Sequence, residues 1–162
     1  MLGADVLKLI AQFRLNGILV DTNLMLLLVV GRLARDRIQS FKRTSMYTVR
    51  DFDLLSSLLL KFEAHFSTPN LATEIDNLSR QLPSREHAAI ANVLRETFGG
   101  QREIYVPTRQ ASAFRHFAAF GLSDSISVAA SAELLFLTDD LPLYGLASSL
   151  GIAAINFNHL RL

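Results

Sequence analysis

The chain has no cysteine among its 162 residues, and it has only 4 prolines. The lack of cysteine excludes disulfides, thiolate zinc sites and cysteine nucleophiles, and it is compatible with a reducing cytosol. No repeat, low-complexity tract or proline-rich linker divides the sequence. Because 50% of the residues are hydrophobic, we expect a single domain over 1–162 that buries roughly 70% of its unfolded surface.

Long apolar runs are also missing. The most apolar window, residues 24–30, is too short to cross a bilayer, and the polar run that begins at Asp21 prevents its extension. The N-terminal region has no small-residue cleavage site and carries charges at Asp5, Lys8 and Arg14, so a signal peptide is not expected. We therefore expect a cytoplasmic protein that has no membrane partner.

Several catalytic patterns are absent. The pair Gly99-Gly100 is interpreted as the loop after a helix and not as a phosphate loop, and no Gly-x-Ser-x-Gly element occurs. The histidines show no His-x-x-x-His pairing; they are His65, His87, His116 and His159. Nucleotide-cofactor and serine-hydrolase functions are therefore not predicted, and we assign the histidines no chemistry.

The net charge is only +1, but it is unevenly placed. Residues 31–50 hold six basic residues and one acid, a net of +5, so the rest of the chain carries 10 basic and 14 acidic residues, a net of −4. Such asymmetry indicates a polyanionic partner, although a solvated helix and loop would also account for it. We take 32–50 as a basic segment whose candidate phosphate contacts are Arg32, Arg35, Arg37, Lys42 and Arg43.

Short apolar runs alternate with segments of helical periodicity. The expected strands are 18–20, 64–67, 104–106, 133–138 and 152–157. The expected helices include 4–15, 24–30, 51–63, 85–97, 111–120 and 142–149, together with one entered through Pro69 and one opened by residues 121–124. We expect the second of these helices to end near Gly31 and Ser123 to act as an N-cap. This alternation predicts an α/β fold with a parallel sheet of about five strands, covered on both faces.

Two of the expected strands end on acids: the first runs into Asp21 and the fourth into Asp139 and Asp140. The carboxyl ends of parallel strands share one edge of the sheet, where open α/β folds bind ligands. Sites made only of acids suit Mg²⁺ or Mn²⁺. Each acid alone is equally well explained as a helix cap or a surface residue. Taken together, they predict a metal site of Asp21, Glu74, Asp124 and Asp140, with Asp139 as the alternative to Asp140.

At these positions the sequence resembles the PIN-domain family, from about residue 17 to 157. The resemblance rests on four motifs in order: Asp21-Thr22-Asn23, Glu74 in a proline-entered helix, Gly121-Leu122-Ser123-Asp124, and Thr138-Asp139-Asp140. It implies a three-layer α/β/α sandwich and a Mg²⁺- or Mn²⁺-dependent endoribonuclease, most often the toxin of a toxin-antitoxin pair. Residues 1–16 are then an N-terminal helical addition.

The resemblance also implies roles and partners. Asp21, Asp124 and Asp140 would hold metal, and Glu74 would hold metal or orient the attacking water. Supporting hydrogen bonds would come from Thr22, Asn23 and Thr138. The partners would be an RNA substrate, a cognate antitoxin and a second copy of the chain. A nuclease for another RNA-processing role, or a PIN-like module that binds RNA or a partner without cleaving it, remains an alternative.

Overall fold

The structure is a computed structural model that describes residues 3–161. Those residues form a five-stranded sheet in the order β3-β2-β1-β4-β5. Every pairing is parallel, and Ile18 of β1 lies opposite His65 of β2 and Leu135 of β4. The strands are β1 (Ile18–Val20), β2 (His65–Ser67), β3 (Arg102–Glu103), β4 (Leu135–Thr138) and β5 (Ala154–Asn156).

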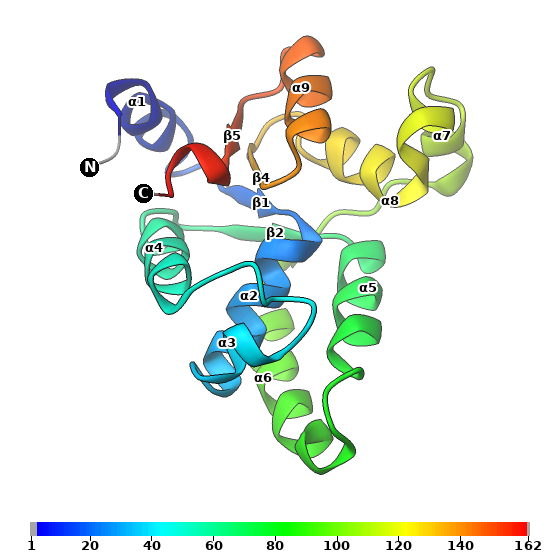
Figure 1. The fold of residues 1–162 in the computed structure, drawn as a ribbon. Helices are drawn as coiled ribbons and strands as arrows, with labels where there is room; N and C mark the ends of the chain where they lie inside the picture. The colour runs from blue at the N-terminus through cyan, green and yellow to red at the C-terminus, as the bar shows by residue number, and fades with distance from the viewer. Residues whose placement is uncertain (1–2, 162) are drawn as a thin grey trace.

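Helices cover the sheet on both sides (Figure 1), so the three-layer α/β/α architecture is confirmed. The lower layer in Figure 1 contains α2 (Thr22–Leu33), α3 (Arg37–Ser40), α4 (Val49–Leu59), α5 (Pro69–Ser79) and α6 (His87–Gly99). Above the sheet lie α1 (Ala4–Phe13), α9 (Leu141–Ser149) and the short 3-10 helix η2 (Phe157–His159). The remaining helices are η1 (Ser84–Glu86), α7 (Thr108–Ser112) and α8 (Phe117–Ala130). Helix α8 contacts both α5 and α9 and thereby connects the two layers.

The core lies around β1 and α2. Strand β1 is buried along its whole length because it has strands on both sides and helices on both faces. Helix α2 is buried from Leu24 to Gly31, which accounts for its being apolar all round. Ile10 anchors α1 in the same core. None of the helices in the described part of the chain combines the length and the apolarity that crossing a bilayer requires.

The end of α2 was expected near Gly31, but Gly31 itself is not the last residue of the helix. The helix continues to Leu33. A Cβ atom at Gly31 would lie 2.2 Å from Cδ2 of Phe52, on helix α4. Glycine is therefore needed here because a neighbouring helix packs closely against α2, and not because the helix terminates.

The third strand was misplaced. It was expected at 104–106, but β3 is Arg102–Glu103, a short, exposed edge strand. The backbone N–H of Ile104 still donates to the carbonyl of Ser67 at 2.9 Å, so the chain follows β2 for one further residue. The apolar residues that suggested a strand lie just after the ladder ends.

The segment expected as one helix over 111–120 is divided between α7 and the start of α8. Helix α8 then continues through Gly121, where φ 80° and ψ −173° produce a kink. Glycine adopts a positive φ without the steric cost that a Cβ imposes. Ser123 is not an N-cap, because it lies beyond the kink and its hydroxyl donates to Glu74. The kink separates the half of α8 that carries Asp124 from the half that follows α7.

Candidate functional site

The acids that follow β1 and β4 lie at the point where the order of the strands reverses. From β1 the chain builds outward to β2 and β3, and it then returns to place β4 and β5 on the other side of β1. Asp21 directly follows β1 and Asp139 directly follows β4. The backbone N–H of Asp21 donates to the carbonyl of Leu137 at 2.9 Å, which holds the two strand ends together. This is the topological switch point at which open α/β sheets bind ligands.

Asp21 is buried, with 7% of its surface exposed. It is the N-cap of α2: its Oδ1 accepts a hydrogen bond of 2.8 Å from the backbone N–H of Thr22. Its Oδ2 accepts one of 2.7 Å from the hydroxyl of Thr138. Burial raises the pKa of Asp21 to about 7 despite these two bonds, and repulsion from Asp124 and Asp139 contributes to the rise. The folded protein therefore favours the neutral form of Asp21 more than an unfolded chain does.

Asp124 is the second perturbed acid. It lies on α8 beyond the Gly121 kink and is half-buried. Burial raises the pKa of Asp124 to about 6, and repulsion from Asp140 and Glu74 adds to the effect. Because Asp124 also raises the pKa of Asp21, Asp124 is the acid that interacts with Asp21 as well as with Asp140 and Glu74.

Glu74 joins three helices. Its Oε2 accepts hydrogen bonds of 2.9 Å from the hydroxyl of Thr22 on α2 and of 2.9 Å from the hydroxyl of Ser123 on α8. Ser123 therefore supports the acid group, a role that the sequence did not indicate. Its position beside Asp124, in the third of the four ordered motifs, was the only signal available. Glu74 is held at the junction of α2, α5 and α8.

Asp139 and Asp140 have different neighbours. Asp139 accepts a hydrogen bond of 3.4 Å from the amide of Asn23 at Oδ1, and it accepts a second one at Oδ2 from the hydroxyl of Tyr47. Asp140 is exposed and caps α9, accepting from the backbone N–H of Leu143 at 2.8 Å. Asp139 therefore lies on the Asp21 side of the group, whereas Asp140 lies on the side of Asp124.

The three predicted supporting residues each bond to one of the acidic side chains. Thr22 donates to Glu74, Asn23 to Asp139, and Thr138 to Asp21. The hydroxyl oxygen of Thr138 also accepts the backbone N–H of Asp140 at 3.1 Å. Thr138 thus fixes the two strand-end turns relative to each other.

The donor set is made of carboxylate, hydroxyl and amide oxygens, which suits a hard divalent cation. Within residues 3–161, however, no three acidic or imidazole side chains are close enough together to hold an ion as they stand. Two carboxylates ~4 Å apart at an effective dielectric near 20 repel by about 4 kcal/mol, so acids without a cation are expected to stay apart. Each carboxylate has about four lone-pair sites, so the two hydrogen bonds to Asp21 leave it able to bind a cation.

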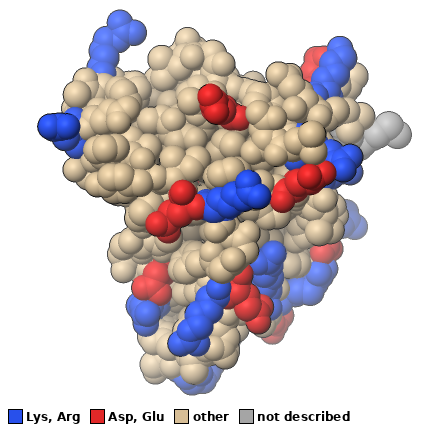
Figure 2. Space-filling model, turned by 180° about the vertical axis from the view of Figure 1, so that it is seen from behind, with Lys and Arg blue, Asp and Glu red and all other residues tan. Residues whose placement is uncertain are grey.

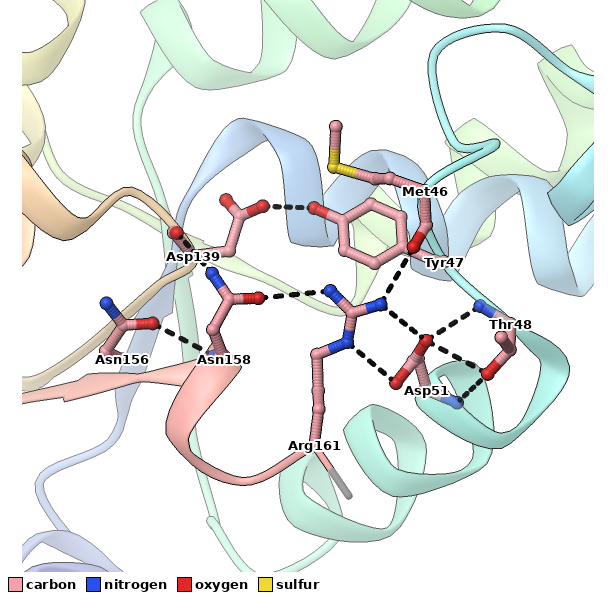
Figure 3. A network of polar contacts seen from close by, with 8 residues as sticks. All are labelled: Met46, Tyr47, Thr48, Asp51, Asp139, Asn156, Asn158 and Arg161. Carbon is pink, nitrogen blue, oxygen red and sulfur yellow. Dashed lines mark hydrogen bonds and ion pairs between the residues drawn. The ribbon is translucent and has the colours of Figure 1, made fainter.

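Tyr47 and Arg161 were not predicted at all. The ring of Tyr47 is fully buried, and burial together with the bond to Asp139 raises the pKa of its hydroxyl above the ordinary value. Arg161 bonds both carboxylate oxygens of Asp51 at 3.0 and 3.1 Å, as Figure 3 shows. It also bonds the side chain of Asn158 at 3.0 Å. These residues form a polar network beside the acids.

The basic segment is partly neutralised in place. Arg35 forms an ion pair of 2.7 Å with Asp53, and Arg37 forms one with Glu86. The other contacts are to neutral side chains, from Arg32 to Thr97 at 3.2 Å and from Arg43 to Gln81 at 2.8 Å. Lys42 is exposed. Seen from behind (Figure 2), the molecule likewise has acidic and basic side chains interspersed, and they do not gather by sign.

Comparison of the chain with protein-family models, with curated proteins and with solved structures found no match. The resemblance to the PIN domain therefore stays a prediction that depends on the ordered motifs. The fold and the contacts around Asp21 are observed independently of it.

Proposed function

We propose that the chain is a metal-dependent endoribonuclease of the PIN type, which hydrolyses phosphodiester bonds of RNA with Mg²⁺ or Mn²⁺. The observation that carries the proposal is Asp21, a buried carboxyl at the switch point of the sheet whose pKa is raised to about 7. Burying a charge beside like charges is costly, and a divalent cation would offset that cost. Strongly perturbed acids in such a position are candidates for a functional site.

Under this proposal Asp21, Asp124 and Asp140 hold the metal, with Asp139 as the alternative to Asp140. When bound, Mg²⁺ or Mn²⁺ lowers the pKa of a water and offsets the charge of the phosphodiester. Glu74 holds metal or accepts a hydrogen bond from the attacking water, and the hydroxyls of Thr22 and Ser123 fix its orientation. The water oxygen bonds to phosphorus and the water gives up a proton to solvent, while the bond to the leaving ribose oxygen breaks and that oxygen takes up a proton.

A groove of about 470 Å³ between α5 and α8 has Glu74 in its lining and supports single-stranded RNA as the substrate. Its wall on α5 carries Asn70, Thr73 and Asn77, and Leu122 contributes an apolar surface from α8. Amides and hydroxyls can hydrogen-bond to the Watson–Crick edges of bases, and these edges are free only in unpaired nucleotides. We assign the phosphate contacts to the basic segment.

The test is cleavage of single-stranded RNA by the purified protein with Mg²⁺ or Mn²⁺. Asp21→Asn and chelator should each abolish cutting. Asp76→Asn is the matched control, because this acid lies on α5 and pairs with Arg80 on the surface, so it should cut normally. Cutting by Asp21→Asn in the presence of chelator would refute the mechanism.

We further propose that the enzyme acts in the cytoplasm as the toxin of a type II toxin-antitoxin pair, and that it binds a cognate antitoxin and forms a homodimer. These proposals depend on the family resemblance. A short gene for a DNA-binding antitoxin directly beside this one is the expected observation. Its absence would favour a PIN nuclease with another RNA-processing role.

A second candidate function is a PIN-like module that binds RNA or a partner without cleaving it. It is favoured by the spacing of the acids in residues 3–161, where no three of them form a ready-made ion site. The two functions are distinguished by measuring RNA binding and cleavage together. Binding that is the same with Mg²⁺ and with chelator, without any cleavage, would establish the second.

A further inference from the structure

A partly buried polar network joins the turn after β4 to the loop before α4, as Figure 3 shows. The hydroxyl of Tyr47 points at Asp139 and donates to its Oδ2. A buried hydroxyl without a partner is costly, and Tyr47, which is fully buried, finds its partner in an acid of the candidate metal site. The tyrosine therefore restricts how that carboxylate can turn.

Holding one oxygen of Asp139 determines where the other one lies. Because Oδ2 is engaged by Tyr47, Oδ1 is left on the side of Asn23, whose amide reaches it at 3.4 Å. The charge of Asp139 also raises the pKa of Asp21. Oδ1 carries only this long bond, so it is the less engaged oxygen and the one that we assign to a cation bound by Asp21.

Arg161 holds both sides of this contact. Its guanidinium lies 5.2 Å from the centroid of the Tyr47 ring and bonds the carbonyl of Met46 at 2.8 Å. It also bonds Asn158 at 3.0 Å, and Asn158 in turn donates to the backbone carbonyl of Asp139 at 2.7 Å. One side chain therefore fixes the loop that carries the tyrosine and the turn that carries the acid.

The anchor of Arg161 is itself rigid. Asp51 takes two bonds from Arg161 and completes the capping box of α4 with Thr48. A bidentate pair of this kind, in which the acid is 9% exposed, gives geometric specificity as well as energy. The network thereby fixes the turn that carries Asp139 relative to helix α4.

We propose, on the basis of the metal-dependent function above, that Tyr47 is a positioning residue that aims Asp139 at the metal, with Arg161 as its support. Under this inference Asp139, given above as the alternative to Asp140, is the metal ligand on the Asp21 side of the site. Residues that orient metal ligands in this way typically contribute 10–100-fold to metal affinity. Tyr47→Phe, which removes only the hydroxyl, should therefore weaken metal binding at least about 10-fold.

The experiment measures Mn²⁺ binding to the whole protein by electron paramagnetic resonance and by calorimetry, without RNA. Tyr105→Phe is the matched control, because Tyr105 is 75% exposed, and it should bind Mn²⁺ as the wild type does. Arg161→Lys, which keeps the charge but loses the planar fork, should weaken binding in the same direction as Tyr47→Phe. Circular dichroism at the binding temperature confirms that each variant is folded.

A double-mutant cycle separates positioning from a merely structural effect. Asp139→Asn should weaken Mn²⁺ binding, and adding Tyr47→Phe to it should cause no further loss, because Tyr47 acts through that carboxylate. Equal binding by wild type and Tyr47→Phe would overturn the inference alone. Tighter binding by Tyr47→Phe would overturn it by showing that the tyrosine holds Asp139 away from the metal. No binding by the wild type would overturn the metal site and this inference together.

Discussion

The variant Asp21→Asn should make the metal-free protein more stable at pH 8 while abolishing its cutting of RNA. The structure gives the reason, because Asp21 is buried and its pKa is raised from 3.8 to about 7. The native state then holds a proton that the unfolded chain releases above pH 3.8. Stability from this group is therefore fully present below pH 3.8 and is lost as the pH rises to about 7.

The size of the effect follows from the same values. A pKa raised from 3.8 to about 7 corresponds to about 4 kcal/mol, at about 1.36 kcal/mol per pH unit. Structural relaxation reduces this, since effective dielectrics near 20 fit even buried sites, and we expect about 2–4 kcal/mol. Asparagine resembles the neutral carboxyl in shape and can accept from the backbone N–H of Thr22 as Asp21 does. It can also donate to the hydroxyl oxygen of Thr138.

The assay is thermal and urea unfolding of both proteins between pH 4 and pH 8 in chelator. The two should have similar stability near pH 4, and Asp21→Asn should unfold roughly 5–15 °C higher at pH 8. Other acids, Asp124 among them, act in both proteins and largely cancel in the difference. If the two proteins have parallel curves of stability against pH over the whole range, the pKa of Asp21 is not raised by burial. That result would remove the main support for the metal site.

Three further predictions concern the metal, the packing of α2 and the basic segment. If Mg²⁺ binds with a dissociation constant near ~1 mM, ~10 mM should stabilise the fold by about 1.4 kcal/mol, or ~3–6 °C. The gain should be larger at pH 8 than at pH 5, where protons compete for the two raised-pKa acids; no gain at either pH would count against the site. Gly31→Ala should lower stability because overpacking costs about 1–3 kcal/mol, whereas the exposed helical Gly145→Ala should not; equal melting temperatures would contradict the close packing. Lys42→Gln should reduce the salt slope of RNA binding by about 0.7 and Arg35→Gln by less, because an acid already pairs with Arg35; an unchanged slope for Lys42→Gln would exclude the segment from the interface.

Local patterns were sufficient for the central elements of the fold. The strand ending on Asp21 and the apolar helix after it were predictable because β1 and α2 are buried on all sides, so their sequences are uniformly apolar. The strand was predicted at 104–106 because those residues are apolar, but the observed strand is a short edge strand of polar residues that lies just before them. Gly31 was taken as a helix end, but glycine is required there because the ring of Phe52 packs against it, and no local pattern reveals that contact.

The candidate site was predictable in outline but not in its contacts. The position of Asp21 and Asp139 at one edge follows from their places at strand ends in a parallel sheet. The contact of Ser123 with Glu74 and that of Tyr47 with Asp139 depend on how helices and loops pack, which spacing along the chain does not encode. The same holds for the basic segment, whose arginines meet partners from other helices.

The central place of β1 has a consequence for hydrogen exchange. The amide of Asp21 bonds the carbonyl of Leu137 between two buried strands, so it should exchange only when the whole domain unfolds. Asp124 depends instead on the half of α8 beyond the Gly121 kink, and Tyr47 on a loop before α4. Both lie outside the sheet, and an element bounded by a kink or a loop opens locally at lower free energy than a central strand. The amide hydrogens around Asp21 should therefore exchange slowly, whereas those around Asp124 and Tyr47 can exchange without global unfolding. A ligand that bridges both parts of the site should slow exchange mainly around Asp124 and Tyr47.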